Sequence, residues 1–119
     1  MPSSPDIPWD RDELVLVLDL YRLTKGPTPP ADAVARLSRT LRARRERIDG
    51  TAPEPKVRST AGISAKLGAF EALKQKTGTT RGSSALVTEV WDDLGHDSKR
   101  AWDAAWAIKK TLPKEERPG

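Results

Sequence analysis

Cysteine is absent from the 119-residue chain, and histidine occurs only once. The lack of cysteine excludes a disulfide framework and any metal site built on thiolates. Nucleophilic and metal-dependent catalysis usually needs histidine as a base or a ligand, so one histidine leaves little from which to build an active site. We therefore expect a binding domain that is not an enzyme and needs no cofactor.

Long apolar runs are also missing. The longest, Leu14–Leu18, is far shorter than the roughly 20 residues that cross a bilayer. The N-terminal residues 1–6 lack the basic stretch and apolar run of a secretion signal. Domains cluster at roughly 100–150 residues, so a chain of this length predicts one domain. We expect a cytoplasmic domain that does not engage a membrane.

Positive charge is concentrated in the middle of the chain. Residues 1–26 sum to −2, residues 27–49 to +3, residues 50–85 to +4 and residues 86–119 to −1. A concentrated basic region releases counterions from a polyanion, which is how most nucleic-acid binders gain affinity. The pattern favours a nucleic-acid partner, with a solvated basic face as the alternative.

Apolar residues recur at helical spacing, and no segment alternates for long enough to predict a sheet. The predicted fold is all-α, a compact bundle of about five helices around a buried central helix, with a short extended piece allowed at 56–59. Residues 1–8 are expected to be a flexible arm, 9–112 the helical domain and 113–119 a linker toward a further region. Helices are predicted from Arg11 to Leu23, from Ala31 to about Arg47, from Ser59 or Thr60 to before Gly78, from a cap at Ser83 or Ser84 to Gly95, and from a cap at Asp97 to before Pro113.

The clearest sequence signal for a helix terminus lies at the start of the first helix. Asp10 and Glu13 have the spacing of a capping box, and Trp9 and Leu14 that of a hydrophobic staple. The following residues, Leu14–Tyr21, are apolar at nearly every position, which is typical of a helix that is buried on all sides. We therefore expect this helix at the centre of the bundle.

Three tryptophans fall on apolar stripes of the last two helices. Trp91 belongs to the fourth helix, and Trp102, Ala105, Trp106 and Leu112 are expected to form the inner face of the fifth. Core packing is the favoured role of these rings, with base stacking as the alternative.

The segment from Lys56 to Lys66 is the best candidate for reading DNA bases. It combines cationic, hydroxyl and small side chains at the start of a predicted helix. Small residues let a backbone approach a groove, and hydroxyls bond base edges or phosphates. The alternative is a basic loop leading into a core helix. The expected base-reading residues are Lys56, Arg58, Ser59, Thr60, Ser64 and Lys66.

Two other segments are candidates for phosphate binding. Arginines crowd the second predicted helix, and their guanidinium forks suit phosphate oxygens, although a charged outer face for solubility is the alternative. The glycines and hydroxyls of 78–84 lead into a helix N-terminus that can offer N–H donors to a phosphate. This segment lacks the lysine and the preceding strand of a nucleotide-binding loop, so an ordinary capped turn is equally compatible. The expected phosphate-binding residues are Arg36, Arg39, Arg42, Arg81, Ser83 and Ser84.

Asp92 and His96 stand four residues apart, a spacing that can place two metal ligands on one helix face. Gly95 ends the helix between them, and no third ligand is evident. We expect a polar turn between two helices and no metal site.

Two motifs stand in order along the chain: Trp9–Leu14 followed by Asp19–Tyr21, and then Gly62–Leu73, with the pattern G-x-x-x-K-L-x-x-F-x-x-L. The first resembles the opening helix of the N-terminal head domain of bacterial McrA-like HNH endonucleases, and the second is similar to another helix of that family. The likeness continues through Arg81–Ser84 and Glu89–Leu94, and covers roughly residues 9–110.

The resemblance implies a reader of modified DNA from a type IV restriction system, placed ahead of an HNH nuclease that this chain does not contain. The implied partner is duplex DNA that carries 5-methylcytosine or 5-hydroxymethylcytosine. Family members often have Asn-Pro-Asn where this chain has Ser59–Ala61, which leaves the modified base open. The alternative is a docking domain that holds a partner subunit or the nuclease and does not recognise DNA specifically.

Overall fold

The computed structural model of the chain describes residues 8–75 and 85–112. The predicted arm before Pro8, the cap at Ser83 or Ser84 and the tail 113–119 lie outside these residues. Within them there are five helices and no strand, which confirms the all-α prediction, and 56–58 forms a turn, so the extended piece allowed at 56–59 is wrong. The helices are α1 (Arg11–Leu23), α2 (Ala31–Asp49), α3 (Thr60–Gln75), α4 (Ala85–Leu94) and α5 (Ser98–Lys109).

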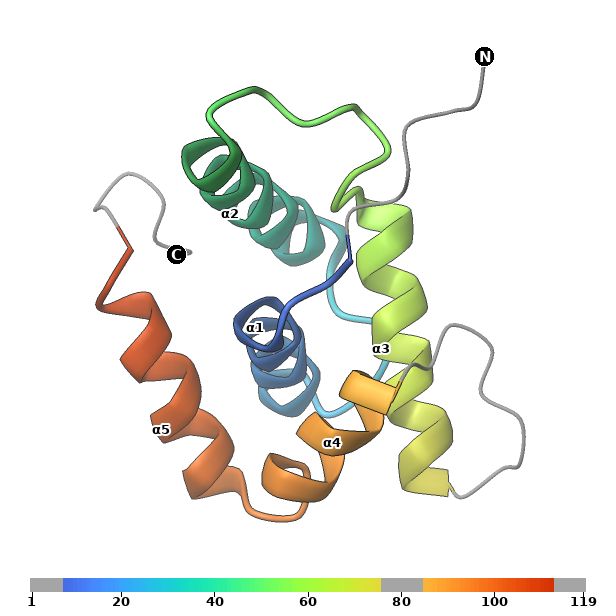
Figure 1. Ribbon diagram of the computed structural model, residues 1–119. Helices are drawn as coiled ribbons and strands as arrows, with labels where there is room; N and C mark the ends of the chain where they lie inside the picture. The colour runs from blue at the N-terminus through green and yellow to red at the C-terminus, as the bar shows by residue number, and fades with distance from the viewer. Residues whose placement is uncertain (1–7, 76–84, 113–119) are drawn as a thin grey trace.

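Helix α1 runs through the middle of the bundle, as predicted (Figure 1). The other four helices all pack against it, and every residue from Glu13 to Asp19 is buried. Because neighbours surround α1, its sequence is apolar on all sides. Helices α3 and α5 lie on opposite sides of α1 and do not contact each other.

The predicted capping box at the start of α1 is confirmed. The Asp10 carboxylate accepts a hydrogen bond from the Glu13 N–H at 2.8 Å, and the Glu13 carboxylate accepts one from the Asp10 N–H at 3.0 Å. The preceding Trp9 is partly buried and packs against the core. These contacts fix the direction in which the chain enters α1.

A buried ion pair joins the start of α1 to the turn that precedes α3. Glu13 is fully buried, and its carboxylate accepts hydrogen bonds from Arg58 Nε at 2.6 Å and Nη2 at 2.8 Å. The Arg58 guanidinium also donates to the Pro8 carbonyl at 2.8 Å and lies 4.5 Å from the ring centroid of Trp9. From α2, the Ser38 hydroxyl donates to the Arg58 carbonyl at 2.7 Å. The pair therefore connects three segments that are distant in sequence.

The orientation of α5 differs from the prediction. Ala101 and Ala105 are buried, whereas Trp102 and Trp106 are 53% and 54% exposed, so the expected inner position of these two tryptophans is wrong. Positions 101 and 105 have the same spacing as 102 and 106, and the small alanines let α5 approach α1 closely. An ion pair between Lys109 Nζ and the buried Asp19 carboxylate, at 2.7 Å, fixes this rotation.

Replacing Arg58 with alanine should lower the free energy of unfolding by about 3–5 kcal/mol, because Glu13 is left as an unpaired buried carboxylate. Urea denaturation near neutral pH measures the change. The control is Arg36→Ala, which removes an exposed pair with Asp32 and should change the free energy by less than about 0.5 kcal/mol. Equal effects of the two substitutions would contradict this role of Arg58.

Candidate nucleic-acid interface

The predicted base-reading residues divide into a buried group and an exposed group. Arg58 is only 4% exposed, and Glu13, Pro8 and Trp9 enclose its guanidinium, so we remove Arg58 from the base-reading set. The Ser59 hydroxyl accepts a hydrogen bond from the Gly62 N–H at 3.2 Å, at the start of α3.

Lys66 is partly buried beside the same cluster. Its Nζ lies 5.7 Å from the ring centroid of Trp9. Burial lowers the pKa of Lys66, and the nearby charge of Arg58 lowers it further. The Lys66 ammonium and the Arg58 guanidinium therefore lie near the same Trp9 ring.

Helix α3 presents an exposed surface made of small side chains. Thr60 and Ser64, both predicted to read bases, are exposed, as is Lys56 in the preceding turn. A Cβ added at Gly68 would meet no atom within 4 Å, so the backbone there is openly accessible. We call this surface the α3 outer face; its exposed residues are Thr60, Ala61, Ser64, Ala65 and Gly68.

Arg42, predicted to bind phosphate, instead holds the loop between α2 and α3. Its guanidinium donates to four backbone carbonyls of this loop at 2.7–3.2 Å. With its donors turned toward the protein, we also remove Arg42 from the phosphate-binding set. The four acceptors are the carbonyls of Pro53, Glu54, Pro55 and Val57.

The other predicted phosphate ligands have different surroundings. Arg36 is exposed and pairs with Asp32 at 3.3 Å. Arg39 is exposed and forms no ion pair with any residue that the structure describes. Arg81, Ser83 and Ser84 lie outside the described residues. Arg39 is therefore the α2 cation best placed for a phosphate.

Two further α2 arginines neutralise the acidic start of α1. Arg44 Nη1 lies 2.8 Å from Asp10 Oδ2, and Arg45 Nη1 lies 3.8 Å from Glu13 Oε1. Burial raises the pKa of Asp10, but the hydrogen bond from Arg44 and the other favourable contacts outweigh it and leave the pKa below its usual value. Counting charge along the sequence missed these pairs because the partners are more than 30 residues apart.

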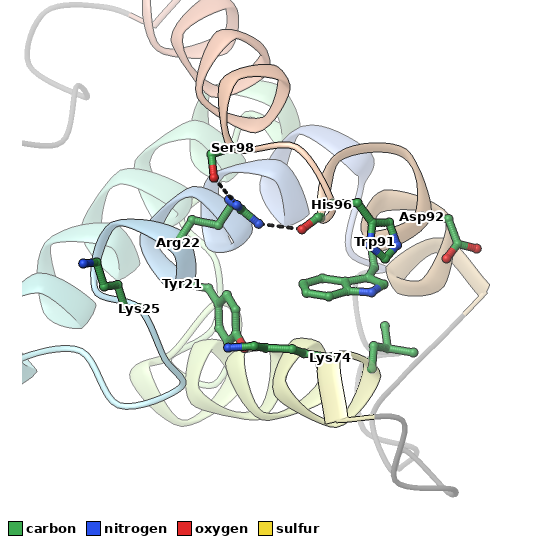
Figure 2. A pocket seen from close by; sticks show the side chains of 10 residues that line it. Tyr21, Arg22, Lys25, Lys74, Trp91, Asp92, His96 and Ser98 are labelled. Atoms are coloured by element: carbon green, nitrogen blue, oxygen red, sulfur yellow. Dashed lines mark hydrogen bonds between the residues drawn. The ribbon is translucent and has the colours of Figure 1, made fainter.

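A pocket of about 930 Å³ opens at the other end of α3, where α1, α4 and α5 also meet. Figure 2 shows Arg22 at its wall, donating to the Gly95 carbonyl at 2.5 Å and to the Ser98 hydroxyl. Gly95 ends α4 as predicted, and a Cβ there would lie 2.5 Å from the Trp91 ring. The side chains that line the pocket include Tyr21, Arg22, Lys25, Leu73, Lys74, Trp91, Asp92, His96 and Ser98.

Charge in this pocket is predominantly positive. Arg22, Lys25 and Lys74 line it, against the single carboxylate of Asp92. The His96 ring meets Trp91 edge to face, with centroids 5.5 Å apart. No cluster of three or more metal-ligating side chains occurs in 8–75 and 85–112. Sequence reasoning missed the pocket because its lining comes from four helices; the cations near the ends of α1 and α3 were the available signal.

Glu71, the one acid of α3, accepts hydrogen bonds from two neighbouring side chains. Tyr21 Oη donates to Glu71 Oε1 at 2.5 Å, and Gln75 Nε2 donates to Glu71 Oε2 at 2.8 Å. These hydrogen bonds lower the pKa of Glu71, while burial and the same contact raise the pKa of Tyr21. The segment of α3 from Thr60 to Phe70 carries no acid at all.

Comparison of the chain with models of protein families, with curated proteins and with solved structures gives no match. None of the described helices is long and apolar enough to span a membrane. The site must therefore be interpreted from its own geometry.

Substituting Arg42 with alanine should lower the free energy of unfolding by about 1–3 kcal/mol, because loop carbonyls lose their donor. Hydrogen exchange at the Val57 amide should also become faster. Arg39→Ala, one helical turn earlier and exposed, is the matched control and should cost less than about 0.5 kcal/mol. If both variants were equally stable, Arg42 would not be the residue that holds the loop.

Proposed function

We propose that this chain is a DNA-binding domain that places the α3 outer face against the major groove of a duplex. The observation that carries the proposal is the composition of that face, which has no acid and no side chain longer than threonine between Thr60 and Gly68. Cations stand at both ends, with Lys56 before the helix and Lys74 near its end. Such a surface can approach base edges closely while its ends meet phosphates.

The dimensions of α3 fit this arrangement. At 1.5 Å per residue, the rise from Thr60 to Lys74 is about 21 Å. The major groove of B-DNA is about 12 Å wide and is bordered by a phosphate backbone on each side. Helix α3 is therefore longer than the groove is wide, so cations near its ends can reach the phosphate backbones that border the groove.

The phosphate contacts proposed here come from two groups of cations. Lys56 and Arg39 serve the N-terminal end of α3, and Lys25 and Lys74, at the pocket of Figure 2, serve the C-terminal end. Four such contacts predict that affinity falls with salt with a log–log slope of about −3.6.

The finer proposal is a reader of modified cytosine that directs an HNH nuclease carried outside this chain. The resemblance of Gly62–Leu73 to a helix of the head domain in McrA-like endonucleases supports it. The methyl and Cα surfaces of Ala61, Ala65 and Gly68 suit apolar contact with a 5-methyl group. Such a contact is worth about 1–3 kcal/mol of discrimination.

The second candidate is a docking face for a helix of another protein. The same small residues favour it, because small side chains allow helices to pack closely. This alternative predicts DNA affinity no greater than that of any protein with a pI near 9.6.

Fluorescence anisotropy with matched plain, methylated and hydroxymethylated duplexes tests the proposal. Ser64→Glu should weaken DNA binding at least about tenfold, because the new carboxylate opposes the phosphates. Ala107→Glu adds the same charge to an exposed site on α5 and should bind like the native chain. Equal losses of affinity in both variants would contradict DNA binding by the α3 outer face. Equal affinity for plain and modified duplexes would contradict only the reading of a modified base.

A further inference from the structure

Helix α5 lies on the opposite side of α1 from α3 (Figure 1) and carries two exposed tryptophans, Trp102 and Trp106. The rings of Trp102 and Trp106 are stacked, with centroids 6.0 Å apart and planes 10° from parallel. Two half-exposed tryptophans leave roughly 150–250 Å² of indole surface in water. The two exposed rings are stacked on each other and therefore form one contiguous aromatic surface, unlike hydrophobic residues that are scattered singly over a surface.

The electrostatics around the pair do not suit a polyanion. Lys99 pairs with Asp103 at 3.0 Å, Arg100 with Asp93 at 2.9 Å, and Lys109 with Asp19 at 2.7 Å. The cations of this helix up to Lys109 are therefore neutralised by neighbouring acids. A nearly neutral aromatic surface favours a protein partner over nucleic acid.

An apolar groove borders the tryptophan pair. It has a volume of about 210 Å³ and lies where α1, α2 and α5 meet. Lys109 lines the groove and stands three residues after Trp106, so the two features are adjacent on the helix surface. A cavity of about 150 Å³ accommodates benzene, so this groove has room for an indole ring. Its apolar lining is Leu16, Leu20, Leu23, Ala33 and Leu37.

We infer that the occupant of this groove is an indole ring from the exposed tryptophan pair of a second copy of the chain. An exposed aromatic pair beside an apolar groove is self-complementary, since a two-fold axis places a ring of each copy in the groove of the other. The rim charges match this arrangement. Arg36 lines the groove and Asp103 flanks the tryptophans. Each forms an exposed pair within its own chain, with Asp32 and Lys99, and across the interface the two can exchange these partners for each other.

The expected dimer is reversible. An interface limited to a single helix and one groove from each copy belongs with the small, weak interfaces, which bury less than about 1,200 Å² in total. Because α5 and α3 lie on opposite sides of α1, the dimer leaves both α3 outer faces open. The inference does not depend on the proposed DNA binding.

Sedimentation equilibrium of the full chain, from low micromolar to near-millimolar concentration, tests the inference. The average mass should rise from one chain toward two. The double variant Trp102→Ala/Trp106→Ala should weaken association at least about thirtyfold, as for residues at the centre of an interface. Ser64→Glu, on the α3 outer face, should associate like the native chain.

A charge exchange makes the test specific to the two-fold arrangement. Arg36→Asp and Asp103→Arg should each weaken association about two- to fivefold, and the two together in one chain should restore it. A mass of one chain at every concentration, or unchanged association of the double tryptophan variant, would overturn the inference. So would quenching of tryptophan fluorescence by a single-stranded oligonucleotide that the double variant abolishes, since the surface would then serve nucleic acid.

Discussion

The buried pair of Glu13 and Arg58 is the interaction on which the arrangement of α3 depends. It ties the first turn of α1 to the turn before α3, and the Ser38 hydroxyl holds the same turn from α2. Arg58 has a φ of 53°, a left-handed conformation that a bulky residue keeps only where surrounding contacts enforce it. The start of α3 is therefore fixed from both sides, and no residue of 8–75 or 85–112 packs over its exposed outer face.

Local signals in the sequence were sufficient for the helices. The Asp10–Glu13 capping box, the left-handed Gly50 after α2 and the Asp97 cap of α5 all act within a few residues, so their spacing alone predicts them. The rotation of α5 was not predictable in the same way. Trp102, Ala105 and Trp106 were expected together on the inner face, but only Ala105 is buried, because it shares with Ala101 the face that approaches α1 closely.

The candidate site was predictable only in part, for a related reason. The exposure of Thr60 and Ser64 follows from their place on α3, opposite the apolar stripe. The inward position of Arg58 and Arg42 does not follow, because their acceptors are a distant carboxylate and loop carbonyls. The sequence alone does not distinguish an arginine that binds phosphate from one whose guanidinium stabilises the fold.

We propose that DNA binds the α3 outer face and that α5 serves a second copy of the chain. An NMR titration of the ¹⁵N-labelled chain with a duplex containing 5-methylcytosine tests this assignment most directly. It predicts the largest shifts at the amides of Ser64, Ala65 and Gly68, with the indole signals of Trp102 and Trp106 unmoved. Shifts concentrated on the indole signals, or no shifts along α3, would contradict it.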